Sequence, residues 1–485
     1  MAAEHNTVTN PHTQTETLKS LSVTIFLKET AGLNRQQEPV TTGVPFAAGI
    51  CPANTLFSLW DDKLQLPLNA EPTLYWPDGS IRWLLINSRV DIAANTEKQL
   101  QLRLNDAAAV SEQNPVSCQK KAGSLVIETA ERIYQFRPNA ISISSSATPD
   151  VSLKLQFELN DRQNNITAFD LEDWQILRSD NTKTLVQTKG TGLLTTENAI
   201  ANIKLTVTIY HADGLIQLKT TLHNPRRSAH IGGLWDLGDS GSLHFNRFSL
   251  VLTAPSLKKS YIIPDCLTEP GERFELQSVF LHQDSSGGEN WHSANHVNKD
   301  GVITTSFQGY QLSSENALLK KGRRANPLFS FWHGEHPLQI SVPEFWQNFP
   351  NALEASPTQL RCDLFAQLAN GLAHELQGGE RKTRSLWLSY SEQANTLAWS
   401  YAPLVPQLDA EYLAQSQAMP WLTTERGDPL AVLIQQGLNG ENNFYRKREQ
   451  IDEYGWRNFG DIFADHETLY QGTEQPRYIS HYNNQ

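Results

Sequence analysis

Residues that can bind an anion or exchange a proton gather in one stretch of the sequence, between positions 454 and 485. Arginine and asparagine side chains donate hydrogen bonds that neutralise a carboxylate, while histidine and tyrosine can act as base and acid. The stretch therefore predicts a site for proton transfer next to an anionic group. The candidates are Arg457, His466, His481 and Tyr482 as catalytic groups, and Asn458, Asn483 and Asn484 as ligands of a carboxylate or a hydroxyl group.

The same residues also have ordinary structural interpretations. Arg457 and Asp461 are four positions apart, a spacing at which opposite charges pair along a helix. His466 lies between two acidic residues and could be a polar helix cap. Tyr454 and Trp456 could be core aromatics. Composition alone leaves these alternatives open beside the catalytic one.

A second candidate is the glycine-rich and polar segment 285–296. Glycine lets a ligand approach the backbone closely. Trp291 could stack on a flat ligand face, and His292 could contact the same ligand. His292 and His296 have the spacing of metal ligands on a helix, but the surrounding Ser, Gly and Asn residues disfavour a helix. We therefore predict a ligand contact or a structural loop here, and no metal site.

Length and composition limit the class of protein. A chain of 485 residues exceeds one hydrophobic core, so two or three domains are expected. With 39% hydrophobic and 19% charged residues, the composition is that of a globular protein. The net charge of −12 argues against a nucleic-acid partner, although a local cationic pocket can still bind an acidic ligand. The four cysteines are too far apart for a zinc site or a disulfide framework.

The ends and the hydropathy pattern give expectations about location. The polar segment 1–17 lacks a basic region followed by an apolar core, so no secretory signal is visible. No run of 18 apolar residues is present, so no membrane partner is expected. These features predict a cytoplasmic protein, or a periplasmic or secreted one if the N-terminus is incomplete. They predict nothing about the oligomeric state.

The elements that must position these residues are mainly strands. Short alternating runs such as 21–27 are separated by turns such as 76–79, and Arg82 is expected to pair with Asp78 there. Helical periodicity starts only after the prolines at 403 and 406. The expected helices cover 410–417, 429–439 and about 444–453, the second one starting at Pro429 and stopping at Asn439–Gly440. The pattern is thus mainly β and multidomain. We expect a disordered lead-in at 1–18, a small β-barrel at 19–110, a large antiparallel β-sandwich at 111–402, and an incomplete helical domain at 403–485.

Six segments carry a family resemblance when taken in order. Together they resemble the exo-rhamnogalacturonan lyase (PcRGLX/YetA-like) family over essentially residues 20–485. The resemblance implies a RIFT-type barrel, a central β-sandwich and the start of an α/α toroid that should continue further. The segments are 39–46, 76–83, 283–291, 345–350, 376–383 and 451–461, the last followed by 464–467 and 481–485.

The family implies a polysaccharide lyase that cleaves a uronic-acid polysaccharide, of the rhamnogalacturonan or ulvan type, by β-elimination. On this interpretation the catalytic and substrate-binding residues are those named above, with Trp291 and His292 as further sugar contacts. No cofactor is expected, and a divalent cation such as calcium is left open. Two alternatives are a glycoside hydrolase with paired carboxylates, such as Asp461 and Glu467, and a non-catalytic carbohydrate-binding fragment.

Overall fold

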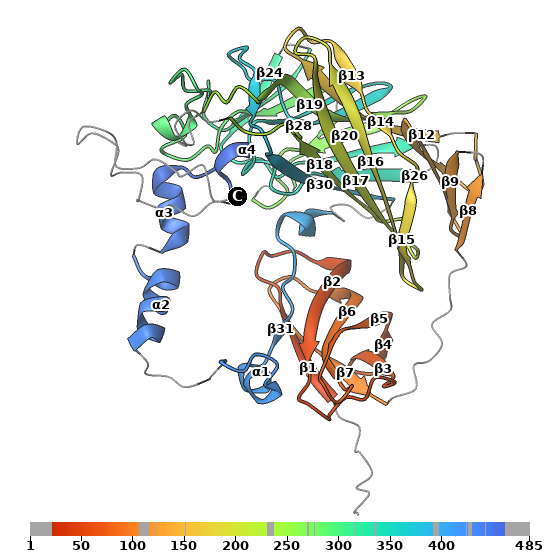
Figure 1. Ribbon diagram of the computed structural model, residues 1–485. Coiled ribbons are helices and arrows are strands. Elements are labelled where there is room, and N and C mark those ends of the chain that lie inside the picture. Colours follow the sequence, from red (N-terminus) through yellow and green to blue (C-terminus); the bar gives the residue numbers. More distant parts are fainter. Residues whose placement is uncertain are drawn as a thin grey trace, which may run out of the picture.

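The fold is mainly β, as the alternation pattern predicts, with a few helices late in the chain (Figure 1). The computed structural model describes residues 22–105, 116–121, 123–150, 152–229, 237–268, 271–275, 277–315, 317–333, 336–390, 397–422, 424, 429–441 and 443–460.

The N-terminal strands form a small barrel from two sheets around one core. Along the first strand Val23, Ile25 and Leu27 are buried at every second position, because alternate side chains of a strand face the same side. Burying each such side chain contributes roughly 1.5–3 kcal/mol. One sheet has the order β31 (Gln407–Leu408), β1 (Ser22–Lys28), β7 (Glu97–Leu104), β3 (Phe57–Asp61), β4 (Leu64–Leu66), and the other β2 (Arg35–Pro45), β6 (Ile81–Ile92), β5 (Leu68–Tyr75).

The prediction that Arg82 forms an ion pair with Asp78 of the turn 76–79 is wrong. The Asp78 carboxylate instead accepts hydrogen bonds from the backbone N–H and the hydroxyl of Ser80. The Arg82 guanidinium lies 4.5 Å from the ring centre of Trp76 and donates to the backbone oxygen of Ala418 at 2.5 Å. Arg82 therefore ties the barrel to the later helical segment, a contact that a local sequence pattern cannot reveal.

The middle of the chain forms a β-sandwich of two large antiparallel sheets in the described part. The larger sheet has the order β24 (Ala317–Gly322), β23 (Tyr310–Ser314), β22 (Val279–Gln283), β27 (Asn351–Ser356), β28 (Gln359–Phe365), β19 (Leu243–Thr253), β12 (Ser152–Asp161), β11 (Ala140–Ser145), β10 (Arg132–Arg137), β9 (Ser124–Glu128), β8 (Ser117–Lys121), with β13 (Ile166–Ala168) beside β12 and β29 (His374–Leu376) beside β19. The other has β14 (Asp170–Leu171), β16 (Lys183–Leu194), β17 (Ala199–Tyr210), β18 (Ile216–His223), β30 (Arg381–Ser389), β26 (His336–Ser341), β25 (Leu328–His333), β20 (Lys258–Ile263), β21 (Phe274–Glu275), with β15 (Gln175–Ser179) beside β16.

The two inner faces share a single apolar core. Along β17, for example, Ile203, Leu205 and Val207 are buried at alternate positions. The core also includes Trp456, which comes from the helical segment. The sandwich core therefore fixes Trp456, and with it the position of the neighbouring residues of the helical segment.

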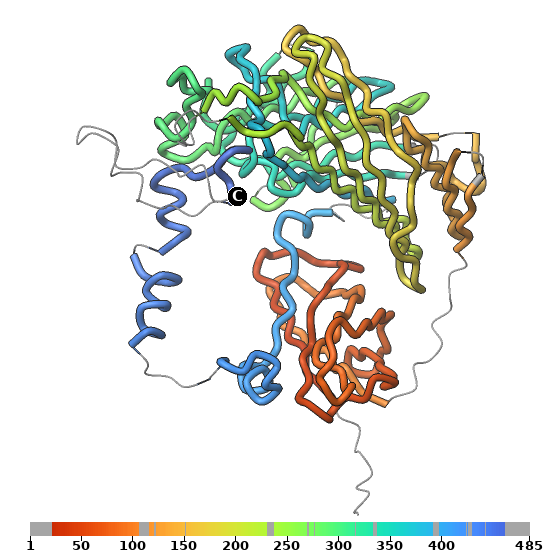
Figure 2. The backbone as a smooth tube through the Cα atoms, in the orientation of Figure 1, coloured from red at the N-terminus to blue at the C-terminus, as the bar shows by residue number. Residues whose placement is uncertain are grey.

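After the sandwich, the chain returns to the barrel before the helices begin. A 3₁₀ turn, η3 (Ala398–Tyr401), leads to β31, which pairs with β1, and Leu404 enters the barrel core. Figure 2 shows this segment running along the barrel. The segment predicted to open a helical domain thus first adds a strand to the barrel.

Four α-helices occur in the described residues. The first three lie close to the predicted positions, and the last was not predicted. They are α1 (Ala410–Ser416), α2 (Pro429–Asn439), α3 (Phe444–Ile451) and α4 (Gly455–Asn458). No residue of α2 is buried, and Figure 1 shows α2 and α3 beside the barrel and sandwich, whereas α4 lies against the sandwich. None of these helices is long and apolar enough to cross a membrane. The toroid stays a prediction.

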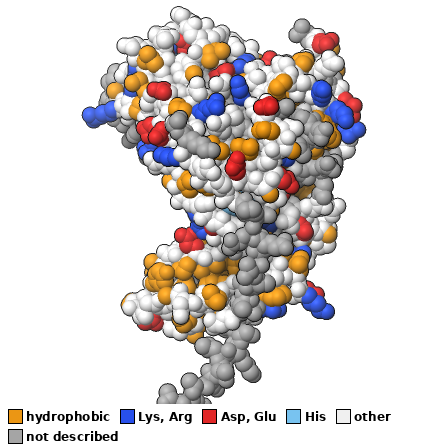
Figure 3. All heavy atoms as spheres, turned by 90° about the vertical axis from the view of Figure 1, so that its right-hand side faces the viewer, with side chains coloured by type: hydrophobic (Ala, Val, Ile, Leu, Met, Phe, Trp, Pro, Cys, Tyr) orange, Lys and Arg blue, Asp and Glu red, His pale blue; other side chains and the backbone are white. Residues whose placement is uncertain are grey.

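The barrel exposes several large apolar side chains. Figure 3 shows apolar groups gathered on the barrel face of that view. The exposed large apolar residues of the barrel strands and turns are Ile50, Leu56, Leu64, Leu74 and Tyr75.

Candidate functional site

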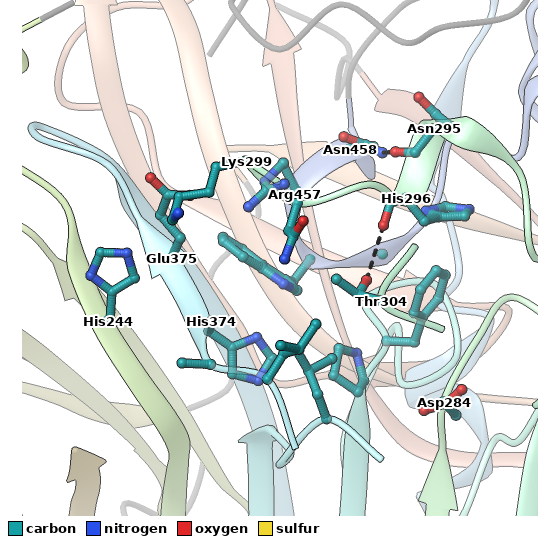
Figure 4. Close-up of a pocket in the computed structure, with 18 of the residues that line it drawn as sticks. His244, Asp284, Asn295, His296, Lys299, Thr304, His374, Glu375, Arg457 and Asn458 are labelled. Carbon is teal, nitrogen blue, oxygen red and sulfur yellow. Dashed lines mark hydrogen bonds between the residues drawn. The ribbon is translucent and has the colours of Figure 1, made fainter. Parts of the chain in front are cut away.

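A cavity of about 280 Å³ lies where α4 meets the loops at one end of the sandwich (Figure 4). Its walls come from the turn after β12, the start of β19, the segment 284–304, β29 and residues 454–458. Most lining residues are polar. The charged ones are three cations, Arg162, Lys299 and Arg457, and three acidic residues, Asp284, Asp300 and Glu375. Apolar groups such as Phe349 and Trp456 complete it. A small apolar floor with convergent polar groups is typical of a small-molecule or sugar site.

The backbone of residues 455–456 fixes α4 against the sandwich. The N–H of Gly455 donates to the Gln347 oxygen at 2.7 Å, and the N–H of Trp456 donates to the Phe349 oxygen at 2.9 Å. Gly455 has a φ of 91°, and a Cβ there would lie 3.0 Å from the Phe349 ring. Glycine is therefore required on two grounds, conformation and space. Trp456 then packs on Phe365, with ring centres 5.2 Å apart.

Asp452, at the corner between α3 and α4, holds the loop 284–304 to the helical segment. Its buried carboxylate lies 2.6 Å from the Nε2 of His296 and also accepts from the hydroxyl of Ser286. Its backbone oxygen accepts from the Asn295 amide at 3.1 Å. Asp452 has a φ of 55°, the left-handed region that Asp and Asn tolerate best among residues with a side chain. One carboxylate thus joins two walls of the cavity.

Replacing Asp452 with asparagine is expected to loosen α4 without straining the backbone, because asparagine also tolerates the left-handed region. Loss of the charged acceptor should weaken the docking by about 2 kcal/mol, which lowers hydrogen-exchange protection of the Gly455 and Trp456 amides about 30-fold. Glu441→Gln is the control, since it removes a carboxylate from an exposed residue of the same segment. Equal protection in both variants would contradict a central role for Asp452.

Arg457 and Asn458, two residues predicted from the sequence, both line the cavity. The Arg457 guanidinium lies 5.0 Å from the Trp456 ring centre and donates to the backbone oxygen of Val297 at 3.3 Å. The Asn458 amide donates to the Asn295 oxygen at 3.0 Å, so its orientation is fixed. Figure 4 places Lys299 next to Arg457. Lys299 itself pairs with Asp300 at 2.7 Å, so Arg457 is the group of this wall that favours an anionic ligand.

Two titratable residues that line the cavity, His374 and Asp284, are buried, and burial disfavours their charged forms. His374 is buried, its Nε2 donates to the Ala366 oxygen at 2.7 Å, and burial lowers its pKa to about 4. Burial also raises the pKa of Asp284, although its carboxylate accepts two backbone N–H bonds, from Ser306 and Phe307. His374 is thus neutral near pH 7 and has a structural place under Trp456, with ring centres 5.8 Å apart.

Other predicted residues lie elsewhere. Trp291 and His292 are outside the cavity lining; the His292 Nδ1 lies 3.1 Å from the hydroxyl of Thr305, and the two aromatic rings contact each other. His292 and His296 have different partners, and the described residues contain no group of three or more His, Cys, Asp or Glu arranged to hold a metal ion. The remaining candidates lie outside the described residues: His466, His481, Tyr482, Asn483 and Asn484, and also Asp461 and Glu467.

Sequence reasoning missed most of the lining residues, among them His244, Lys299 and Glu375. His244 and Glu375 face each other on the paired strands β19 and β29, which are far apart in sequence, so no local pattern could join them. Lys299 follows the predicted loop 285–296 directly, and extending that loop to the next turn could have found it.

Comparison with known proteins supports a family for the chain. Residues 25–104 match the family model described as the PcRGLX-like N-terminal RIFT barrel domain. This match supports the PcRGLX-like family for the N-terminal part of the chain. The N-terminal sheets are accordingly a RIFT barrel, as the resemblance implied.

Two solved structures show partial likeness. An alpha-mannosidase from Enterococcus faecalis V583 has 10% identity and a TM-score of 0.39, over 82% of this chain and 45% of that one, so the chain spans less than half of that protein. A galactose mutarotase-like protein from Lactobacillus casei ATCC 334 has 10% identity and a TM-score of 0.28, over 55% of this chain and 99% of that one. Likeness this weak says nothing about function. No curated protein matches the sequence.

Proposed function

We propose that the protein is a polysaccharide lyase-like protein that acts on a uronic-acid polysaccharide, of the rhamnogalacturonan or ulvan type, by β-elimination in the cavity at α4. The observation that carries the proposal is the position of Arg457 beside Lys299 in a cavity closed by Trp456 and Phe349. The family match of the barrel supports a carbohydrate ligand.

The chemistry of elimination explains why these cations matter. The proton on C5 of a uronate is weakly acidic, because its removal places negative charge next to the carboxylate. Donors aimed at that carboxylate stabilise the charge as it develops, and they act most strongly where water is excluded. Arg457 and Lys299 supply two positive charges, and Arg457 can also bind the carboxylate through two parallel hydrogen bonds. Both residues therefore take the role of carboxylate ligands.

Neutral groups complete the proposed site. Asn458 is held by Asn295 on the same wall as Arg457, and its amide can contact the carboxylate or a sugar hydroxyl. Trp456 and Phe349 are almost fully buried and form the apolar floor of the cavity, so they shape the space that a sugar would enter. Lys299 already pairs with Asp300 at 2.7 Å. Arg457 is therefore the cation that distinguishes an acidic polymer, whose carboxylate it can bind, from a neutral one.

The experiment incubates the chain with rhamnogalacturonan, ulvan and a neutral polymer such as arabinan. Elimination leaves an unsaturated uronate that absorbs in the ultraviolet, whereas hydrolysis leaves new reducing ends without that absorbance. We expect the absorbance to rise with an acidic polymer only. Reducing ends alone would favour a glycoside hydrolase, and retained binding without either product would favour a carbohydrate-binding protein.

A further inference from the structure

One end of the cavity is built around His244, which none of the roles above uses. His244 is the second residue of β19, and its partner on β29 is Glu375, which lines the same cavity. Figure 4 shows the two side chains next to each other, away from Arg457. This end therefore presents an imidazole to a ligand whose carboxylate is held near Lys299.

Glu197, in the turn between β16 and β17, holds His244 with both of its carboxylate oxygens. One oxygen lies 3.1 Å from the His244 Nδ1, and the other accepts from the His244 backbone N–H at 3.0 Å. Burial works to raise the pKa of Glu197, but the hydrogen bonds from His244 outweigh it, so the pKa lies below the ordinary value. An ionised Glu197 accepts a hydrogen bond from the Nδ1–H group, so the lone pair of the neutral imidazole lies on Nε2.

The turn that carries Glu197 is itself fixed by a buried carboxylate across the sandwich. Asp161, at the end of β12, accepts from the hydroxyls of Thr195 and Thr196. It also accepts from both nitrogens of Asn165 at 2.9 Å and from the Gln163 N–H at 2.9 Å. Glu197 and His244 thus come from opposite sheets, and both are held by backbone that cannot shift freely. Such rigid support is what a proton-transfer group needs.

We infer, on the basis of the function proposed above, that His244 is the base that takes the C5 proton and that Glu197 is its positioning residue. The Nε2 of His244 binds the proton, and the electron pair of the C5–H bond becomes the C4–C5 double bond. The C4–O bond breaks with its electron pair going to the leaving oxygen, which takes a proton from a water molecule. The resulting hydroxide removes the proton from His244, so the enzyme returns to its initial state.

The charges around His244 are of both signs. Glu197 from the β16–β17 turn and Glu375 from β29 favour the protonated imidazole that forms in the step. Arg162, from the turn after β12, lines the same cavity and opposes that charge. The two carboxylates therefore stabilise the imidazolium that forms when His244 takes the C5 proton.

The test compares His244→Gln and Glu197→Gln with the wild type on the acidic polymer that it cleaves. General base catalysis contributes about 10²–10⁴-fold, so H244Q should lower kcat at least about 100-fold while KM changes less than about threefold. E197Q should lower kcat less and also move the limb of the pH–rate profile that lies between about pH 5 and 8, where histidine titrates. His223→Gln is the matched control, since His223 lies at the end of β18 and does not line the cavity.

A merely structural ion pair between the sheets would give a different result. H244Q or E197Q would then lower activity only through unfolding, equally at every pH. His244→Ala with added imidazole separates the two cases, because a small base in the vacated space should restore at least tenfold activity to an enzyme that lacks only its base. No rescue, or a kcat of H244Q within threefold of the wild type, would overturn the role of His244 and leave the lyase proposal intact. A wild type that forms no unsaturated product would overturn both.

Discussion

Replacing Arg457 with methionine is expected to lower kcat/KM for elimination by about 10²–10³-fold, the loss seen when one donor to a developing anion is removed. The loss should appear in kcat as well as KM, because the charge on the substrate grows as the C5 proton leaves. Arg457→Lys keeps the positive charge but lacks the planar pair of donors, so a loss of about tenfold is expected. The measurement is the initial rate of ultraviolet absorbance over a range of polymer concentrations.

The control for Arg457 is Arg446, which lies on α3. The Arg446 side chain is exposed, and within the described part of the chain it donates a long hydrogen bond, 3.4 Å, to the Glu441 backbone oxygen. Arg446→Met removes the same charge at a surface position, so its kcat/KM should stay close to that of the wild type. If R446M and R457M lost activity equally, the effect would reflect the overall charge of the protein, and the cavity would not be the site.

The order of the fold could be predicted because each element carries its own local signal. Alternating side chains indicate strands wherever one face is buried, as at Val23, Ile25 and Leu27. The bounds of α2 agree with the prediction because Pro429 favours a first turn and Gly440 follows the last one. The return of Leu404 to the barrel could not be predicted, because it depends on pairing between residues hundreds of positions apart.

The candidate site could be predicted only where several of its residues stand close together in the sequence. Arg457 and Asn458 stand in a short stretch rich in polar and aromatic residues, and they line the cavity. His244 and Glu197 each look like an ordinary polar residue of a strand or a turn. Their meeting depends on the packing of two sheets, and the support from Asp161 depends on a third segment. Such a site is set by tertiary structure, so single-sequence patterns do not contain it.

Replacing Arg35 with methionine is expected to be the most destabilising single change in the barrel. The Arg35 guanidinium is buried between two buried carboxylates, 2.7 Å from an oxygen of Glu29 and 2.7 Å from an oxygen of Glu38. It also donates to the Ala402 oxygen at 2.7 Å, while Glu38 accepts from the Leu404 N–H at 2.6 Å. Removing the cation leaves two buried charges unpaired, at a loss of about 3–5 kcal/mol. The returning segment should detach from the barrel as well.

The pH dependence of this effect identifies its cause. In the wild type, burial disfavours the charge of Glu29, but hydrogen bonds from the Asn95 backbone and Arg35 lower its pKa to about 2. A lowered carboxyl pKa stabilises the fold above the unfolded value of about 4.3, and this contribution is lost as the pH falls toward 2. Glu38 opposes this in part, because burial raises its pKa. Without Arg35 the pKa values of both Glu29 and Glu38 must rise. The free energy of unfolding of R35M should therefore be higher at pH 5 than at pH 7.

Calorimetric unfolding of the wild type and R35M at pH 7 and pH 5 measures the difference in stability between the two proteins. We expect the difference in the free energy of unfolding between the two proteins to narrow at pH 5. Loss of Arg35 raises the pKa of the buried Glu38 further, whereas backbone N–H groups still lower the pKa of Glu29. Lys28→Met is the control: Lys28 and Glu97 form an exposed pair on the same barrel, so its loss should leave the unfolding temperature unchanged at both pH values. A stability difference that stays constant with pH would mean that Arg35 acts through the packing of its side chain. In that case the charges of Arg35, Glu29 and Glu38 would not join the returning segment to the barrel.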